Sequence, residues 1–248
     1  MLSPAQIEHY HREGYVIPDY RLPLPVLDAI KADHARLIAR HPEFADYCGA
    51  LLVQDFCFLN YANNPHILDM VAQLIGPDIA LWNSSMFAKP AQVGTRTPWH
   101  QDGEYWPIEP LATCTVWIAL DDATPANGCL RFLPGTHKAQ QLASHHFSDA
   151  KDIALPLELD AEYVDEQRAV DVELQAGQMS LHDVYLYHGS AANPTDQPRR
   201  GMTLRYMPTT SVYRRDLNKS PIDARRSVFL MRGRDVSGKN DFSVQAPA

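Results

Sequence analysis

The first third of the chain has the spacing of polar and apolar residues that amphipathic helices show. Ser3 and Gln6 are spaced as a capping box, and Gly14 is placed to end this short helix. A longer helix is predicted over about residues 25–40. Its apolar stripe consists of Leu27, Ile30, Leu37 and Ile38. Another helix is predicted over residues 64–76, with an asparagine at its start and a glycine at its end.

From about residue 79 onward the pattern changes to short runs rich in β-branched and aromatic residues, separated by turn signals such as Asn127-Gly128. We predict strands at residues 80–88, 113–120, 129–133, 170–174, 179–181, 184–187 and 202–207. Helices followed by antiparallel strands favour a mainly β fold with flanking helices, namely a double-stranded β-helix or cupin-like jelly roll. We expect one domain over residues 1–248, with a mainly helical flank (1–78), a jelly-roll core (79–210) and a C-terminal extension (211–248).

A long polar segment, residues 138–167, interrupts the predicted strands. We expect it to form an excursion over one end of a sheet, where such loops often cover active sites. His137, His145 and His146 lie at or within its start, and histidines in polar loops are more often solvated or hydrogen bonded than bound to zinc. The extension after residue 211 carries several arginines, so it either folds back over the mouth of the barrel or stays in solvent.

Composition narrows the classes of partner. The 248 residues are 45% hydrophobic, which is enough for one large core. A net charge of -8 and a pI near 5.7 give no basic footprint for nucleic acid or an anionic membrane, so a small molecule is the expected partner. The sequence has neither a long apolar run nor a secretion signal at its start, and its four cysteines have no paired spacing. We therefore expect a cytoplasmic protein with reduced thiols and no membrane span; the sequence indicates no oligomeric state.

Candidate chemistry centres on His100 and Asp102, which lie two positions apart in a predicted extended segment. Side chains at i and i+2 of a strand point the same way, so both can reach one ion while Gln101 faces away. His188 supplies a second imidazole from a distant part of the chain. Two imidazoles and one carboxylate suit a mononuclear iron(II) site and leave three metal positions open.

Arg199 follows His188 by eleven residues, in Pro198-Arg199-Arg200-Gly201. A guanidinium offers a planar fork that matches a carboxylate. A turn after His188 and a return strand from about Arg199 would bring that fork beside the metal, where it could hold the remote carboxylate of a chelating diacid. The neighbouring Arg200 is the alternative clamp, and His182 is the less favoured alternative to His188.

Four segments together resemble the phytanoyl-CoA dioxygenase family of iron(II)- and 2-oxoglutarate-dependent oxygenases. They are Trp99-His100-Gln101-Asp102-Gly103, Trp117-Ile118-Ala119-Leu120-Asp121-Asp122, the run from Asn127 to His137, and His188-Gly189-Ser190 with Arg199. The resemblance spans roughly residues 80–208. It implies iron(II) held by His100, Asp102 and His188. It also implies that Arg199 and Ser190 bind the far carboxylate of 2-oxoglutarate and that Trp117 and Met86 line its pocket.

The resemblance further implies a reaction with dioxygen that releases succinate and carbon dioxide. Halogenating relatives have glycine or alanine where this chain has Asp102, so hydroxylation of a small molecule is expected. Two alternatives stay open: a cupin-like metalloenzyme that does not use 2-oxoglutarate, and a non-catalytic jelly-roll binding module. The candidate substrate contacts are Tyr105, Trp106, Asn83 and Arg205, with Tyr187 and Tyr206 as further possibilities. The sequence does not name the substrate.

Overall fold

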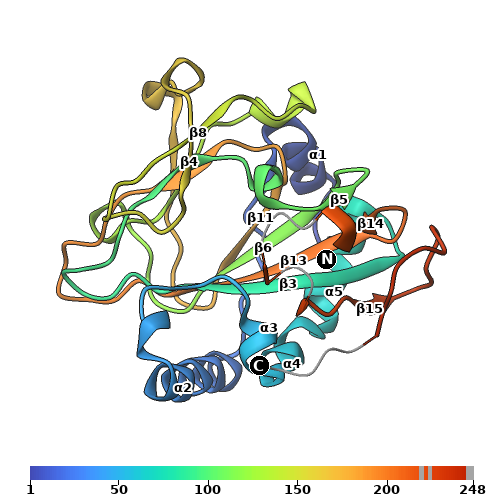
Figure 1. The fold of residues 1–248 in the computed structure, drawn as a ribbon, viewed down its shortest axis with the longest axis horizontal. Coiled ribbons are helices and arrows are strands. Elements are labelled where there is room, and N and C mark those ends of the chain that lie inside the picture. The colour runs from blue at the N-terminus through green and yellow to red at the C-terminus, as the bar shows by residue number, and fades with distance from the viewer. Residues whose placement is uncertain (218–220, 223–224, 244–248) are drawn as a thin grey trace.

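Two antiparallel sheets form the centre of the computed structural model, which describes residues 1–217, 221–222 and 225–243 (Figure 1). The larger sheet has the strand order β1-β11-β6-β13-β3-β15, and β2 also pairs with β3. Its strands are β1 (Tyr15–Val16), β2 (Tyr47–Cys48), β3 (Ile79–Phe87), β6 (Cys114–Ala119), β11 (Met179–Asp183), β13 (Gly201–Pro208) and β15 (Phe229–Arg232). The helical flank and the C-terminal extension thus each add strands to the sheet built by the core.

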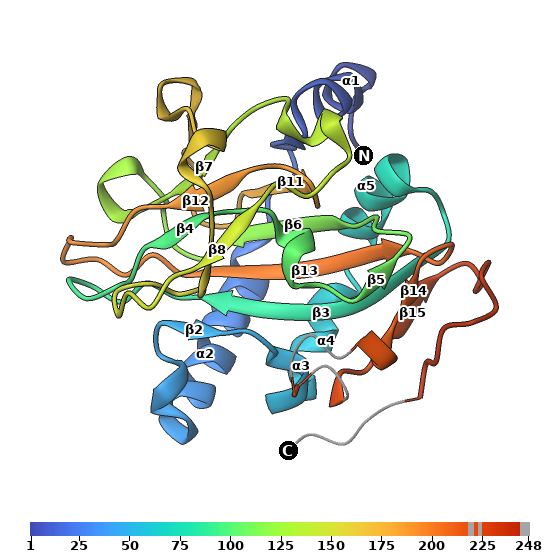
Figure 2. The same ribbon diagram turned by 45° about the horizontal axis from the view of Figure 1, so that its top comes forward.

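The smaller sheet has the order β10-β7-β12-β4 and lies across one face of the larger sheet (Figure 2). Its strands are β4 (Thr97–His100), β7 (Leu130–Phe132), β10 (Val170–Val172) and β12 (His188–Ser190). Two hairpins complete the set, β5 (Ile108–Glu109) with β14 (Val212–Tyr213), and β8 (His145–Phe147) with β9 (Leu157–Leu159). This double-sheet arrangement is the predicted jelly roll, with helices at its flank.

Five α-helices precede the long strands, and the three longest follow the predicted helix signals closely. They are α1 (Pro4–Glu13), α2 (Leu24–Arg40), α3 (Leu51–Gln54), α4 (Leu59–Ala62) and α5 (Pro65–Ile75). Ser3 and Gln6 form the predicted capping box, and Gly14 ends α1 in the left-handed conformation that glycine tolerates best. Short 3-10 helices lie at Pro42–Phe44, Phe56–Phe58, Asp102–Tyr105 (η3), Pro125–Asn127, Thr136–Ala139, Ala161–Tyr163, Glu166–Arg168 and Arg215–Leu217.

The main hydrophobic core lies between the larger sheet and the helices. Apolar side chains of α2 and α5 pack there against one face of β3, β6 and β13, leaving the other face toward the smaller sheet. Successive side chains of a strand point to opposite faces, so only every second residue of these strands can reach the space between the sheets. Among the described residues, no helix is long and apolar enough to span a membrane.

Two details of the predicted elements were wrong. Residues 184–187 form a turn rather than a strand, because the chain must reverse between β11 in the larger sheet and β12 in the smaller one. In α2, the stripe facing the core contains His34, whereas Ile38 is only partly buried. His34 lies four residues after Ile30 and faces the sheet more directly than Ile38, which lies eight residues after it. The helix therefore buries the imidazole ring of His34.

Candidate active site

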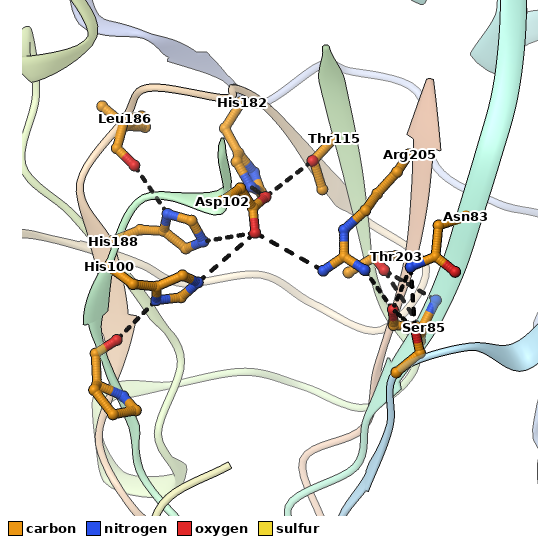
Figure 3. Close-up of polar contacts among 12 residues, drawn as sticks. Asn83, Ser85, His100, Asp102, Thr115, His182, Leu186, His188, Thr203 and Arg205 are labelled. Atoms are coloured by element: carbon orange, nitrogen blue, oxygen red, sulfur yellow. Dashed lines mark hydrogen bonds and ion pairs between the residues drawn. The ribbon is translucent and has the colours of Figure 1, made fainter. Parts of the chain in front are cut away.

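The three predicted metal ligands converge between the sheets at the end of β4. His100 is the last residue of β4, His188 is the first residue of β12, and the two pair directly across the smaller sheet. Asp102 begins η3 just after the strand. One ligand atom from each residue can be chosen so that all three lie within 4.8 Å of one another, and all three residues are buried (Figure 3).

Backbone carbonyls fix the orientation of both imidazoles. His100 Nδ1 lies 2.8 Å from the carbonyl of Pro98, and His188 Nδ1 lies 2.9 Å from the carbonyl of Leu186. A carbonyl only accepts, so each Nδ1 carries the proton and each Nε2 keeps its lone pair. Burial, followed by the neighbouring His100, holds the pKa of His188 well below its usual range. The His188 ring is therefore neutral, and both rings direct Nε2 toward the place where a metal would bind, as metal-binding histidines commonly do.

The two oxygens of Asp102 have different surroundings. Thr115 Oγ1 donates to Oδ2 at 3.1 Å, and His182 Nε2 lies 3.5 Å from the same oxygen. Oδ1 instead faces His100 Nε2 at 3.7 Å and His188 Nε2 at 3.9 Å. Burial alone would raise the pKa of Asp102, but Arg205 and the surrounding imidazoles hold it well below its usual range. The carboxylate is ionised, and Oδ1 is the oxygen placed to bind a metal.

This donor set fits ferrous iron. Two neutral nitrogens and one carboxylate oxygen on one side of a metal are the arrangement found in non-haem iron(II) oxygenases. The three residues line a cavity between the sheets, which a metal held by them would face. We call it the inner cavity; its lining includes the triad and Ser190, Arg199, Trp117, Thr115, His182, Thr203, Phe87, Thr97, Leu130 and Arg205.

Arg199 brings a buried positive charge into the inner cavity. Only 1% of the residue is exposed, and its guanidinium carbon lies 5.3 Å from the centre of the Trp117 ring. Burial lowers the pKa of Arg199 to about 10, so it stays charged at neutral pH. Within the described chain it forms no ion pair, and its Nε has no hydrogen-bond partner. A buried cation without an anion is costly, so the cavity is suited to an anionic guest.

Compared with the neighbouring basic residues, Arg199 is the cation best placed to bind an anion in the inner cavity. Arg200 donates from Nε and Nη2 to the two carboxylate oxygens of Asp121, at 2.7 and 2.8 Å. It is therefore already paired outside the inner cavity. Burial, and then the charge of Arg199, lower the pKa of Lys89 to about 6, so that amine is largely neutral at neutral pH. Ser190 lines the inner cavity together with Arg199.

A larger space, the outer chamber, shares Asp102 and Arg205 with the inner cavity. It has a volume of about 360 Å³, within the range of small-molecule sites. Four of the six sequence-predicted substrate candidates line it: Asn83, Tyr105, Trp106 and Arg205. Its other lining residues are Tyr47, Gly49, Trp82, Asp102, Glu104, Leu155, Leu157 and Arg226. The predicted excursion contributes Leu155 and Leu157, so it does cover this part of the molecule.

Three residues proposed from the sequence lie elsewhere. Met86 points into the main core on the opposite face of β3, and Phe87 lines the inner cavity instead. Tyr206 lies in that same core, where its hydroxyl donates to the carbonyl of Ala62 at 2.8 Å. Tyr187 is partly buried and lines neither space. The corrections at Met86 and Tyr206 follow from which side of β3 and β13 faces the helices.

Other residues at the site were missed or discounted. His182 is not part of the three-ligand group, yet it lies behind Asp102 and neither of its ring nitrogens has a hydrogen-bond partner. Thr203 lies two residues before Arg205 on β13, so the period of the strand could have indicated Thr203 once Arg205 was a candidate. Arg226 had no local signal, because the extension reaches the chamber only through the folded structure.

A family model described as phytanoyl-CoA dioxygenase (PhyH) matches residues 1–201, most of this chain. The chain belongs to the phytanoyl-CoA dioxygenase family. Human peroxisomal phytanoyl-CoA dioxygenase is 30% identical to this family member over 164 residues, which cover 62% of this chain and 48% of the human protein. The chain spans about half the length of the first curated relatives it matches.

Solved structures are similar to this phytanoyl-CoA dioxygenase family member over most of its length. The non-haem monooxygenase ThoJ, without ligand, is 27% identical with a TM-score of 0.76, covering 97% of this chain and 89% of ThoJ. EvdO2 from Micromonospora carbonacea var. aurantiaca, complexed with 2-oxoglutarate, is 25% identical with a TM-score of 0.70, covering 84% and 91%. Family membership and the His-Asp-His group indicate iron(II), 2-oxoglutarate and dioxygen as the cofactor and cosubstrates, as predicted.

Proposed function

We propose that this protein is an iron(II)- and 2-oxoglutarate-dependent dioxygenase that hydroxylates a small molecule and releases succinate and carbon dioxide. The observation that carries the proposal is the pairing of two features in one cavity. His100, Asp102 and His188 present a metal-binding group, and the buried cation of Arg199 lies in the same cavity without an anion. A metal-chelating diacid such as 2-oxoglutarate satisfies both features together.

Each residue then has a defined task. His100, Asp102 and His188 would hold iron(II), which with 2-oxoglutarate and dioxygen supplies the oxidising power for an unactivated C–H bond. Arg199 and Ser190 would hold the far carboxylate of 2-oxoglutarate, and the Trp117 ring would keep the guanidinium in place. Thr115 donates to Oδ2 of Asp102, so that Oδ1 would be directed at the metal. The outer chamber would hold the substrate away from bulk water.

Hydroxylation is proposed over halogenation because Asp102 fills the position that a halide would need. Its carboxylate is buried and ionised beside both imidazoles, which leaves no vacant ligand position on that side. The two alternatives, a cupin-like metalloenzyme that does not use 2-oxoglutarate and a non-catalytic binding module, give no role to the buried charge of Arg199. We also infer a cytoplasmic location and no nucleic-acid partner from the sequence, although the human relative named above is peroxisomal.

Anaerobic absorption spectroscopy tests the proposal. Adding iron(II) and 2-oxoglutarate should give a weak visible charge-transfer band, which His100→Ala should abolish. His146→Ala is the matched control: this histidine is exposed on the excursion and pairs with Asp160, so the band should persist. With oxygen admitted and a substrate panel supplied, succinate formation should rise and the product should gain one oxygen atom. Intact protein that gives no band with iron(II) and 2-oxoglutarate would contradict the proposal.

A further inference from the structure

Gln101 lies between two of the proposed metal ligands and is completely buried, although it is polar. Its backbone is extended, with φ -109° and ψ 132°, so its side chain points to the side opposite those of its neighbours His100 and Asp102. It does not line the inner cavity. A buried amide is tolerated only when it is hydrogen bonded, so the partners of Gln101 show which segments it holds together.

The side chain of Gln101 uses its whole amide group to bind two other segments. Its Oε1 accepts from the amide of Ala143 at 2.7 Å, and its Nε2 donates to the carbonyls of Gln141 and Tyr185, at 3.0 and 2.9 Å. The first two partners belong to the excursion over residues 138–167, and Tyr185 belongs to the turn between β11 and β12. A glutamate here could accept from Ala143, but it could not donate to two carbonyls.

The backbone of Gln101 binds the excursion as well. Its N–H donates to His145 Nε2 at 3.1 Å, and His145 Nδ1 lies 2.9 Å from the carbonyl of Ala143. Since an amide donates and a carbonyl accepts, the proton of His145 is on Nδ1 and the lone pair is on Nε2. The excursion is therefore attached to this one residue through Gln141, Ala143 and His145.

The bond to Tyr185 extends the connection to the third proposed ligand. Tyr185 is followed by Leu186, whose carbonyl orients the ring of His188 at 2.9 Å from Nδ1. Gln101 is thus joined by peptide bonds to two of the proposed ligands, and it holds the turn that presents the third. The same side chain holds the excursion, so the positions of the excursion and of the metal-binding group depend on each other.

We propose that Gln101 is a positioning residue of the metal site, through which docking of the excursion and binding of the metal are coupled. The proposal rests on the proposed function, because it concerns the ligands assigned to iron(II) there. When the excursion lifts, Gln101 loses three hydrogen bonds, and the segment that carries His100 and Asp102 loses its support. The excursion also supplies Leu155 and Leu157 to the outer chamber, so a molecule bound against them would stabilise the docked excursion and, through Gln101, the metal site.

Coupling between two sites is reciprocal, so it can be measured in the unaltered full chain. Saturating nickel(II) should slow hydrogen exchange at the Ala143 amide, the group bonded to Gln101 Oε1, by about fivefold or more, the lower end of usual couplings. An excursion that only covers the site would open as often with nickel as without it, and exchange at Ala143 would not change.

Gln101→Met tests the residue itself, because methionine keeps the length of the side chain and removes its donors and acceptor. Nickel binding, measured by calorimetry, should weaken by about fivefold or more, and the effect of nickel on exchange at Ala143 should disappear. The charge-transfer band of iron(II) and 2-oxoglutarate should shift, because the ligands are held differently; a purely structural role would lower stability and leave this band in place. Gln167→Met is the matched control, an exposed glutamine at the end of the same excursion, and it should change none of these quantities.

His145→Ala provides a second test that leaves Gln101 unaltered. It removes the acceptor of the Gln101 backbone amide, so nickel binding should weaken in the same direction as in Gln101→Met. The adjacent His146→Ala is its matched control, because His146 is exposed and bonds to Asp160, and nickel binding should not change. Circular dichroism establishes that each variant is folded before binding is compared. If Gln101→Met does not fold, His145→Ala and the exchange measurement on the unaltered chain decide.

Two results would overturn the coupling and leave the proposed oxygenase standing. One is exchange at the Ala143 amide that saturating nickel does not slow. The other is folded Gln101→Met or His145→Ala protein that binds nickel as tightly as the unaltered chain. Intact, unaltered protein with no affinity for nickel would be a different failure, because it would contradict the proposed metal site itself and the coupling with it.

Discussion

The position of Arg199 depends on a residue that has no side chain. Gly201 begins β13 two residues after Arg199, and the Trp117 indole lies directly over its Cα. A Cβ at this glycine would lie 2.0 Å from Trp117 Cζ2 and 2.2 Å from Cε2, closer than any real contact allows. Because Arg199 stacks on this ring, the glycine lets the indole and guanidinium occupy the wall of the inner cavity together.

Gly201→Ala should therefore displace the Trp117 ring and disturb the cosubstrate site. Overpacking of this kind costs about 1–3 kcal/mol, which should appear as a loss in the free energy of unfolding measured with denaturant. The affinity for 2-oxoglutarate should fall as well, because the guanidinium loses its support. Adding Trp117→Phe removes the ring atoms that the new methyl group meets, so the double variant should recover part of the lost stability. An alanine variant as stable as the unaltered protein, with undiminished affinity, would show this contact to be unimportant.

At the scale of elements, the segment 138–167 shows how a polar stretch can cover a site. Its hairpin, β8 with β9, lies beside β4 and so next to the metal-binding group. The Tyr105 hydroxyl from η3 donates to the carbonyl of Leu157 at 3.0 Å and accepts from its amide at 3.1 Å. One side chain therefore fastens the hairpin to the segment that carries Asp102, and Leu157 is held on the wall of the outer chamber.

Tyr105→Phe should loosen this hairpin without emptying the space that the ring fills. Removing the hydroxyl leaves a partly buried amide and carbonyl without their partner, at a cost of about 1–3 kcal/mol. Hydrogen exchange at the Leu157 amide should speed up, and limited proteolysis should cut within 138–167 sooner. Tyr163→Phe is the control, since this tyrosine lies on the same excursion and is 38% exposed. Equal protection of the Leu157 amide in both variants would show that the Tyr105 hydroxyl does not hold the hairpin.

Elements were easier to predict from the sequence than the direction in which their side chains point. The capping box and Gly14 located α1 closely, because those signals depend on local backbone chemistry. In β3, both faces are buried, so the strand lacks the alternation of polar and apolar residues that would indicate orientation. The family resemblance selected Met86, and the sequence pattern gave no sign that the folded strand presents Phe87 instead, a shift of one residue that exchanges the two faces.

At the scale of the whole molecule, the proposed site is divided between the two sheets. His100, Asp102 and His188 come from the smaller sheet and the turn after it, whereas Arg199 lies at the entry to β13 of the larger sheet. Motif spacing together with the family resemblance pointed to these four residues, because each lies in a short segment with its own pattern. It could not select Arg226, whose position depends on how the extension packs back against β3 and the loop at Gly49.

This division predicts that metal and 2-oxoglutarate stabilise the fold in two separate increments. Nickel(II), an air-stable substitute for iron(II), should raise the melting temperature by binding the triad of the smaller sheet. Saturating 2-oxoglutarate should raise it further by joining the metal to Arg199 across the sheets. A ligand at a hundred times its Kd contributes about 2.7 kcal/mol, which corresponds to roughly 5–10 °C for a chain of this size.

Arg199 and Arg200 are adjacent, so variants of each can test which residue causes the further rise in melting temperature with 2-oxoglutarate. Arg199→Met should keep the increment due to nickel and lose most of that due to 2-oxoglutarate, whereas His100→Ala should lose both. Arg200→Met is the matched control: it breaks the ion pair with Asp121 and lowers the starting melting temperature, but both increments should persist because Arg200 points away from the cavity. An undiminished 2-oxoglutarate increment in Arg199→Met would mean that the cosubstrate is anchored elsewhere, so that the buried charge of Arg199 is balanced by another anion.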